Sequence, residues 1–380
     1  MLESFFLYVY NIFMKLSTTS IHVGQQADPS TGAIIPPLYL RSTYVQERPG
    51  IHKGYEYTRS GNPNFTNAEQ TLAVLEQWSY GLIYNSGLWA TNTVILSLLQ
   101  SGDKVLAIDD VYGWTFRMFS DVFSKFGIEF EQIDLSKENL LSAKLQESNV
   151  KLLRIESPTN PLLKTTDLEP VLALAKQQDV ISVVDNTFAT PYFQQPLSMW
   201  ADIVLHSTTK YLGGHSDIIG WATITNDEKI FDALSYHRNA AGLNPNPFDA
   251  RLLSRSLKTL SVRMKQHDEN GRILSQRLRN HDLVKQVYYP WFGGMVSVEF
   301  SLSLEETIDV ISNLQLFRLA ESLGWVESLI EHPASMTHAS IPKATRESQW
   351  LTDGLVRISI GIEDVEDLWS DLEIQLHLRS

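Results

Sequence analysis

The sequence predicts an α/β protein with a mostly parallel central sheet covered by helices and a smaller C-terminal α+β domain. Short apolar runs alternate with helix-like stretches through the middle of the chain, as in strand–helix–strand units. Each run is apolar throughout, as expected when both faces of a sheet are covered. The last third instead combines alternating apolar and polar runs with helical patterns, which is typical of an α+β domain.

The expected elements follow in chain order. Residues 14–65 are irregular because they contain several clusters of turn-forming residues, and a helical pattern begins at Asn67. The predicted strands of the large sheet are 104–108 (KVLAI), 150–155 (VKLLRI), 180–184 (VISVV) and 202–206 (DIVLH). The helices predicted between them cover residues 115–126, 136–147 and 168–178.

The C-terminal third begins after a loop-like segment at 242–247. A long amphipathic stretch covers 248–279, and the runs at 295–300 (MVSVEF) and 356–360 (VRISI) are expected strands. We therefore expect three parts: an N-terminal extension (1–65), an α/β domain (66–245) and the α+β domain (246–380).

Composition excludes several classes of protein. The 380 residues contain no cysteine, so disulfides, thiolate metal sites and cysteine nucleophiles are ruled out. The net charge of −13 argues against nucleic acid as a partner. The most apolar stretch, 5–13, is shorter than the roughly 20 residues that span a bilayer. We expect a cytoplasmic protein without a membrane partner, in which residues 1–13 are a disordered tail or precede the true start at Met14.

Polar side chains follow each predicted strand of the large sheet. They are Asp109, Asp110, Tyr112 and Gly113; Glu156, Ser157, Thr159 and Asn160; Asp185, Asn186 and Thr187; and Ser207, Thr208, Thr209 and Lys210. Ligands of parallel sheets bind at these strand ends. A lysine can form a Schiff base, a carboxylate can pair with a ring nitrogen, and hydroxyls suit a phosphate. This combination of groups indicates pyridoxal phosphate (PLP).

Each residue also has a structural interpretation. Asp185 would serve as a helix N-cap and Arg357 as one half of an ion pair. Lys210 or Glu327 would be a solvated charge, and Tyr112 a core residue. A metal pair of His206 and His215 is disfavoured because no carboxylate ligand stands at helical spacing from them.

Five motifs resemble the Cys/Met-metabolism family of PLP enzymes, and the resemblance covers residues 16–375. They are 55–63 (YEYTRSGNP), 156–161 (ESPTNP), 184–188 (VDNTF), 206–217 (HSTTKYLGGHSD) and 327–333 (ESLIEHP). The family includes cystathionine γ-synthase, γ-lyase and β-lyase and methionine γ-lyase. The resemblance implies the fold-type I PLP-dependent transferase fold.

The resemblance also implies roles around the cofactor. Lys210 would bind it covalently and then act as the base. Asp185 would keep the pyridine nitrogen protonated, Tyr112 would stack on the ring and help deprotonate the incoming amine, and Asn160 would bond the phenolic oxygen. The phosphate and the rest of the cofactor would be held by Gly87, Leu88, Ser207, Thr209 and Thr187.

Further roles concern the neighbouring subunit and the substrate. Tyr57 and Arg59 of the N-terminal arm would reach the phosphate of a neighbouring copy, which implies a homodimer and usually a homotetramer. Arg357 would bind the α-carboxylate of an amino-acid substrate, with Ser328 and Asn160 alongside. Arg117 and Glu327 would face the distal end of the substrate.

Glu327 favours a reaction at Cγ over a β-lyase reaction, since the β-lyases of the family tend to have an aromatic residue at that position. We therefore expect a cystathionine γ-lyase, which yields cysteine, 2-oxobutanoate and ammonia; Glu331 slightly resembles that branch. The alternatives are a γ-synthase joining cysteine to an activated homoserine ester, then a β-lyase or methionine γ-lyase. A non-catalytic relative, or an α/β ligand-binding protein without the cofactor, would belong to another class.

The tryptophans depart from the family pattern. The chain has 9 tryptophans and only 20 glycines. Trp78, Trp114, Trp200, Trp291, Trp325 and Trp350 stand where the family usually has glycine, and Trp89 and Trp221 stand at small-residue positions. We hypothesise that the gene uses UGA for glycine and that this codon was translated as tryptophan. The alternatives are genuine divergence with compensating space, or a degenerate pseudoenzyme.

Overall fold

We describe the chain from a computed structural model, which covers residues 14–77, 79–111, 113–337, 339, 343–348 and 350–379. The expectations for residues 1–13, Tyr112 and Trp78 lie outside the described residues. The chain folds into two compact units. The first comprises residues up to 109, 117–155 and 167–261, and the second comprises 110–116, 156–166 and 262–380.

The first unit contains a seven-stranded, mostly parallel sheet. In spatial order the strands are β1 (Tyr80–Tyr84), β7 (Trp221–Thr225), β6 (Ile203–Ser207), β5 (Ile181–Asp185), β4 (Val150–Glu156), β2 (Lys104–Ile108) and β3 (Glu129–Ile133). β2 pairs in parallel with β3 and β4, and β5 with β6, whereas β7 runs antiparallel to β1 and β6. This confirms the predicted fold class.

The four predicted strands are present with ends shifted by at most one residue, as β2, β4, β5 and β6. Three further strands were not predicted. β3 (EFEQI) lies at the edge of the sheet and leaves most of its side chains at least partly exposed, so its composition is that of a polar segment. β1 (YGLIY) and β7 (WATIT) are as long as β2, but glycine, threonine or alanine interrupts their apolar runs.

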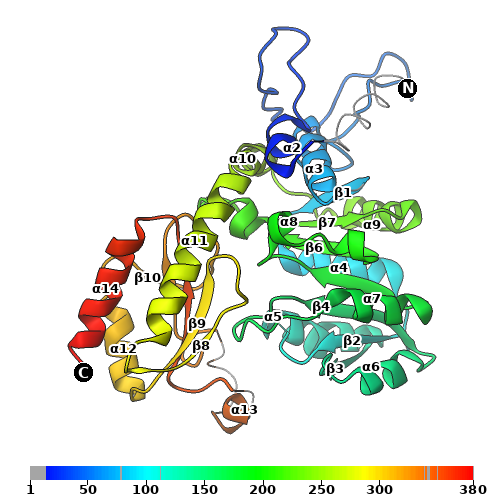
Figure 1. The fold of residues 1–380 in the computed structure, drawn as a ribbon. Helices are drawn as coiled ribbons and strands as arrows, with labels where there is room; N and C mark the ends of the chain where they lie inside the picture. The colour runs from blue at the N-terminus through cyan, green and yellow to red at the C-terminus, as the bar shows by residue number, and fades with distance from the viewer. Residues whose placement is uncertain are drawn as a thin grey trace. The chain divides into compact units, whose positions relative to one another are not determined.

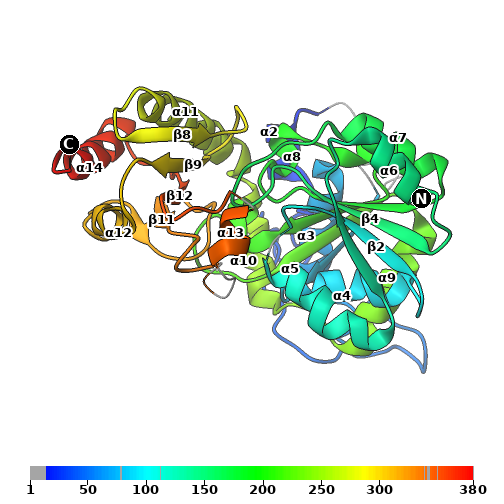
Figure 2. The ribbon, with the colours of Figure 1, turned by 90° about the horizontal axis from the view of Figure 1, so that it is seen from below.

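Helices cover both faces of this sheet. Those of the first unit are α2 (Leu16–His22), α3 (Pro63–Leu75), α4 (Gly87–Leu98), α6 (Glu138–Leu145), α7 (Leu168–Gln177), α8 (Thr190–Phe193), α9 (Glu228–Ala241) and α10 (Pro247–Leu257). α4 and α9 lie on one face, where their buried side chains join the core formed by β2, β5 and β6, and α6 and α7 lie on the other (Figure 2). Strands and helices follow one another along the chain in this unit, as Figure 1 shows.

Two predicted helices differ in detail. Residues 113–126 form the short helix α5 (Gly113–Arg117), a π-helical turn (Met118–Val122) and a 3-10 turn (Phe123–Phe126). The stretch 248–279 forms two helices, α10 and α11 (Leu260–Arg279). The break has a local cause: the Thr259 amide and hydroxyl both donate to the Ser256 carbonyl, at 3.1 Å each. Such local bonds compete with the bonds that continue a helix.

The second unit is built on a five-stranded sheet. Its spatial order is β10 (Arg318–Leu319), β11 (Leu329–Glu331), β12 (Leu355–Ser359), β9 (Met295–Phe300) and β8 (Val284–Tyr288). α11, α12 (Leu304–Ser312) and α14 (Val365–His377) pack their buried residues on one face of it, and a short helix, α13, covers Lys343–Ser348. Even α11, at 20 residues, is too polar to cross a bilayer, and no other helix in the described ranges is suited to it.

A fully buried polar cluster ties α3 to the large sheet. The Glu76 carboxylate, just after α3, lies 2.6 Å from the His206 Nε2 atom of β6. The Asn186 amide, just after β5, donates to the same carboxylate oxygen at 3.1 Å. All three side chains are essentially inaccessible to water. Two adjacent strand ends are therefore held by one carboxylate.

Replacing Glu76 with alanine is expected to lower the free energy of unfolding by about 2 kcal/mol, because the His206 ring and the Asn186 amide would lose a buried partner. Urea unfolding followed by circular dichroism measures this. Glu76→Gln is the matched variant, since it keeps an acceptor oxygen and should lose less. An alanine variant as stable as the parent chain would contradict the structural role of the cluster.

His267 of α11 makes the stability of the second unit depend on pH. Its ring is buried, Nδ1 lies 2.8 Å from the Ile360 carbonyl, and burial lowers the pKa of His267 to about 4 from 6.5. The unfolded chain therefore takes up a proton that the folded chain refuses, and stability is lost as pH falls from about 6.5 to about 4. The free energy of unfolding, plotted against pH over this range, should change less for His267→Gln than for the parent chain. The same pH dependence in both proteins would contradict this assignment.

Candidate active site

Lys210 lies in an irregular turn that follows strand β6. The turn covers Thr208–Leu212, and Lys210 departs from helical geometry, with φ −91° and ψ −137°. Its carbonyl accepts a hydrogen bond from the Gly214 amide at 2.7 Å. A Cβ at Gly213 would lie 2.5 Å from the Thr208 carbonyl oxygen, so glycine is needed there. The backbone thus determines where the lysine side chain leaves the turn.

Asp185 stands at the end of β5, the strand next to β6. Its Oδ1 accepts a hydrogen bond from the Thr187 amide at 3.1 Å, and its Oδ2 accepts one from the Arg154 guanidinium, also at 3.1 Å. The Asp185 side chain is 11% exposed and that of Arg154 only 2%. Both carboxylate oxygens are therefore oriented by a donor, and the group remains partly accessible.

The predicted phosphate-binding residues surround the start of α4 and the end of β6. α4 begins at Gly87, and the free amides at the N-terminus of a 12-residue helix favour an anion. Ser207 is buried, and its amide donates to the Thr187 hydroxyl at 2.8 Å. The Thr209 hydroxyl is bonded to both the amide and the carbonyl of Gly220. A Cβ at Gly87 would lie 2.5 Å from the Trp221 ring, so the approach to this helix end is narrow.

In the second unit, Arg357 of β12 is the centre of a buried polar cluster. Its guanidinium donates to the Asn160 Oδ1 atom at 2.9 Å, to the Ser322 carbonyl at 2.6 Å and to the Glu331 carboxylate at 2.6 Å. Glu331 is paired directly opposite Arg357 in the β11–β12 ladder. The other Glu331 oxygen accepts from the Thr337 hydroxyl at 2.8 Å. The cluster orients a guanidinium whose planar fork suits a carboxylate.

Ser328 and Glu327 precede β11. The buried Ser328 hydroxyl donates to Glu363 at 2.9 Å and accepts from the Gly361 amide at 2.9 Å. These two hydrogen bonds link the turn before β11 to residues 361 and 363. Glu327 is exposed, and Arg117 ends α5 in a half-buried position.

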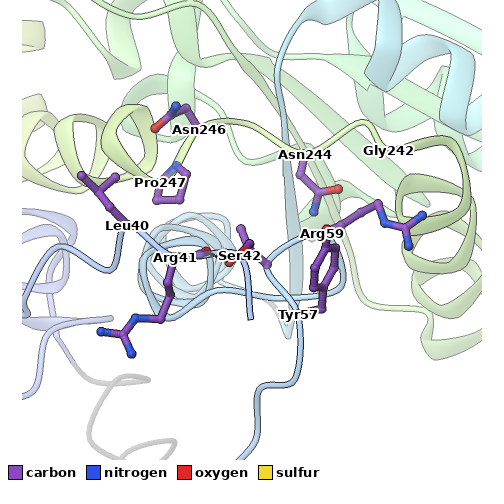
Figure 3. Close-up of a pocket in the computed structure, with 10 residues that line it drawn as sticks. Leu40, Arg41, Ser42, Tyr57, Arg59, Gly242, Asn244, Asn246 and Pro247 are labelled. Carbon is purple, nitrogen blue, oxygen red and sulfur yellow. Dashed lines mark hydrogen bonds between the residues drawn. The ribbon is translucent and has the colours of Figure 1, made fainter. Parts of the chain in front are cut away.

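Tyr57 and Arg59 of the N-terminal arm line a pocket of about 570 Å³ in the first unit. Figure 3 shows both side chains beside Asn244 and Gly242, with Arg41 at the opposite end of the pocket. The Arg59 guanidinium lies 5.7 Å from the Tyr57 ring centre. Both amide atoms of Asn244 are buried without a hydrogen-bond partner in the described chain. The pocket thus presents two cations and an unsatisfied amide.

Three residues of these clusters were missed in the sequence. Arg154 had a detectable signal, because it is the only guanidinium in an apolar strand (VKLLRIE) that the sequence places in the core. Glu331 was noted only for its resemblance to one family branch, although its place in an apolar run was a similar signal. Glu76 carried no signal, since its partners are contributed by strands far away in the sequence. Tyr112 lies outside the described residues.

Comparisons with known proteins agree with these features. Residues 17–377 match the family model described as Cys/Met metabolism PLP-dependent enzyme. The chain is 48% identical to a cystathionine beta-lyase of Coxiella burnetii, with 95% of this chain and 97% of that protein covered. It is 46% identical to a cystathionine gamma-lyase of Bacillus subtilis, with 94% and 98% covered.

A solved structure gives the same result at the level of the fold. The cystathionine gamma synthase of Xanthomonas oryzae pv. oryzae, in complex with aminoacrylate and cysteine, is 40% identical and superposes with a TM-score of 0.92 over 96% of this chain and 98% of that one. With a lysine in an irregular turn, an oriented carboxylate on the adjacent strand and a family match over nearly the whole length, the chain belongs to the PLP-dependent enzymes of Cys/Met metabolism.

Proposed function

We propose that this enzyme cleaves the Cγ–S bond of cystathionine, so that cystathionine and water give cysteine, 2-oxobutanoate and ammonia. The observation that carries the proposal is the pairing of β5 with β6. Asp185 is in register with Leu205, and Lys210 follows five residues after Leu205 on the same strand and turn. A lysine amine and an oriented carboxylate on adjacent strand ends are the two groups that PLP chemistry requires.

The residues of the first unit fit PLP by the chemistry of their donor groups. A primary amine suits the aldehyde of PLP, and a carboxylate suits its pyridine nitrogen. Two hydroxyls and the amides of a helix N-terminus suit its phosphate. Asp185 would bind the protonated ring nitrogen, with Thr187 near it, and Gly87, Leu88, Ser207 and Thr209 would hold the phosphate. When bound, PLP supplies an electron sink for the negative charge that develops at the substrate Cα.

Lys210 does the proton work in this proposal. Its amine holds the cofactor until substrate arrives, and it then removes the proton from Cα and transfers protons to and from Cβ. The backbone of the turn Thr208–Leu212 determines the direction in which this side chain leaves the main chain. Tyr112 is proposed to stack on the ring and to take a proton from the incoming amine.

Arg357 is proposed to bind the α-carboxylate of the substrate, assisted by Asn160 and Ser328. Its guanidinium is already shared with the Asn160 side chain and Glu331, so it is held in one orientation before substrate binds. A second carboxylate near Glu331 is tolerated because a guanidinium carries five donors. The proposed substrate class is therefore an α-amino acid.

Tyr57 and Arg59 are proposed to bind the phosphate held by a second copy of the chain. Support comes from the arm itself, which exposes large apolar side chains at Ile34, Leu40, Val45 and Ile51 that a single chain leaves in water. We propose a homodimer as the minimal active species and a homotetramer as the assembled form.

The choice of the γ bond rests on Glu327, whose exposed carboxylate can pair with the distal ammonium group of cystathionine, with Arg117 for the distal carboxylate. A β-lyase is the second candidate, since the Coxiella relative with that name is 48% identical. A γ-synthase is the third, since the Xanthomonas protein with that name superposes closely.

Incubation of the purified protein, loaded with PLP, with cystathionine is expected to release cysteine and 2-oxobutanoate. Homocysteine and pyruvate would instead identify a β-lyase. Formation of cystathionine from cysteine and an O-acylhomoserine, without cleavage, would identify a γ-synthase. Lys210→Ala is the control that should lower kcat by about 10²–10⁴-fold.

Arg357→Leu is expected to raise KM for cystathionine by about 10–100-fold, because it removes a charge-assisted pair with the α-carboxylate. The KM of Arg357→Lys should lie between those of the parent enzyme and Arg357→Leu, since lysine keeps the charge without the planar fork. Initial rates over a range of substrate concentrations measure both. An unchanged KM in a folded Arg357→Leu enzyme would place the carboxylate elsewhere.

A further inference from the structure

Arg154 places a permanent positive charge against the carboxylate that is proposed to face the cofactor. Its NH2 atom lies 3.1 Å from the Asp185 Oδ2 atom, and the Arg154 side chain is 2% exposed. In the buried run LLRI of β4, the three residues other than Arg154 are apolar. Burial removes the hydration of a guanidinium, and this cost must be offset by a charged or hydrogen-bonding partner.

The two donors on Asp185 act together. Arg154 bonds one carboxylate oxygen and the Thr187 amide bonds the other, so rotation of the carboxylate breaks both bonds. Each oxygen keeps further lone-pair capacity for a third donor. Any donor that bonds Asp185 therefore does so beside the permanent positive charge of Arg154.

We propose that Arg154 is a positioning residue that orients Asp185 toward the pyridine nitrogen and adjusts the strength of that contact. This rests on the proposed cofactor chemistry. The expected consequence is that Arg154 changes the electronic state of the bound ring, beyond its contribution to stability.

The visible absorption spectrum of the PLP-loaded protein and its dissociation constant for PLP test this. Arg154→Leu is expected to shift the absorption maximum and weaken PLP binding at least about 10-fold, and Arg154→Lys should recover part of both. Lys104→Leu is the matched control: it removes ion pairs with Glu131 and Glu147 in the same sheet. Lys104 is the first residue of β2, two strands from β5, and lies at the opposite end of the parallel strands from Asp185, the last residue of β5. This variant should lower stability and leave the spectrum unchanged.

A folded Arg154→Leu protein with the parent spectrum and affinity would overturn the proposal. If that variant does not fold, Arg154→Lys decides, and a spectrum and an affinity identical to those of the parent would count against the role. A parent protein that binds no PLP would instead overturn the proposed function and would be recognised before any variant is compared.

An independent observation concerns tryptophans in backbone conformations that favour glycine. Among the described residues, nine that are not glycine have positive φ, and three of them are Trp200 (74°), Trp291 (70°) and Trp350 (67°). None of the phenylalanines and tyrosines in the described ranges does, although the chain has 16 and 14 of these. A Cβ is crowded in this conformation, and bulky residues there are true outliers.

Two of these tryptophans close helical turns with the same hydrogen bonds as two glycines. At Trp200, the amides of residues 200 and 201 donate to the carbonyls of Leu197 and Pro196. At Trp350, the amides of residues 350 and 351 donate to those of Glu347 and Arg346. Gly127 and Gly242 make this pair of bonds with φ of 77° and 71°. This is the turn in which helices most often place glycine.

These indoles make surface contacts: the Lys176 ammonium lies 5.6 Å from the Trp200 ring centre, and the Arg279 guanidinium lies 4.4 Å from that of Trp291. Trp200, Trp291 and Trp350 are 57%, 68% and 68% exposed. Trp221 shows the opposite problem: its indole N–H is buried and has no hydrogen-bond partner among the described residues, and its ring fills the space against Gly87. An indole thus narrows the approach to the N-terminus of α4, where the phosphate is proposed to bind.

We infer that positions 200, 291 and 350 are glycines in the protein that its own cell makes, and that these tryptophans come from a codon which that cell reads as glycine. The same origin at position 221 would account for the indole that lies against Gly87. Glycine at position 221 would widen the proposed phosphate site.

Peptide mass spectrometry of the protein isolated from the cells that carry the gene is the direct test. Glycine is expected at positions 200, 291, 350 and 221, encoded by UGA. Tryptophan in any of the peptides containing 200, 291 or 350, or UGG codons at those positions, would overturn the inference.

Thermal unfolding of the recombinant, tryptophan-containing chain tests the backbone argument separately. Trp200→Gly and Trp350→Gly are each expected to raise the midpoint by about 2–4 °C, because a left-handed Cβ is removed. Trp369→Gly is the matched control: Trp369 lies within α14 and packs on the core, so its loss should lower the midpoint. A fall at all three positions would overturn the argument. Trp221→Gly should tighten PLP binding, and this last result also depends on the proposed function.

Discussion

The parallel pairing of β5 with β6 is the constraint on which the first unit's chemistry depends. It brings the end of one strand, with Asp185, beside the end of the other, with Ser207 and the Lys210 turn. Neither strand end is free to move. Glu76 bonds Asn186 and His206, the residues next to Asp185 and Ser207. The Ser207 amide in turn bonds the Thr187 hydroxyl. The two strand ends are thus held by bonds through the sequence neighbours of Asp185 and Ser207, while the Asp185 carboxylate itself accepts from Arg154 and from the Thr187 amide.

The second unit uses the same principle with a buried ion pair. Burying a charge is costly unless it is paired and hydrogen-bonded, and Arg357 meets this with Glu331, Asn160 and the Ser322 carbonyl. The ladder register places Glu331 directly opposite Arg357, so the pair forms as the strands form. A guanidinium prepared in this way loses little conformational freedom when it binds a carboxylate. Its affinity is moderated, however, because one anion is already present.

How much the sequence could predict depended on where the determining contacts lie. Strands β2, β4, β5 and β6 were predictable because both of their faces are buried, which demands continuous apolar runs. β3 was not, since an edge strand can be polar. The residues at strand ends were predictable from topology, because a parallel sheet gathers its carboxyl ends. Arg154, Glu76 and Glu331 were not recognised, since each is defined by a partner that is distant in sequence and adjacent only in the fold.

Backbone geometry also changes what the aromatic composition means. An excess of tryptophan in a chain is ordinarily a sign of ring-stacking surfaces or of a large core. Here Trp200 and Trp350 occupy the same hydrogen-bonded turns as Gly127 and Gly242, with their rings largely in water. Both rings are mostly exposed and both backbones have positive φ, and the Trp200 ring has a surface contact with the Lys176 ammonium, 5.6 Å from its centre. A requirement on the backbone explains this placement. At these positions the excess of tryptophan and the shortage of glycine then have one cause, and the same cause would account for the Trp221 ring that lies against Gly87 at the proposed phosphate site.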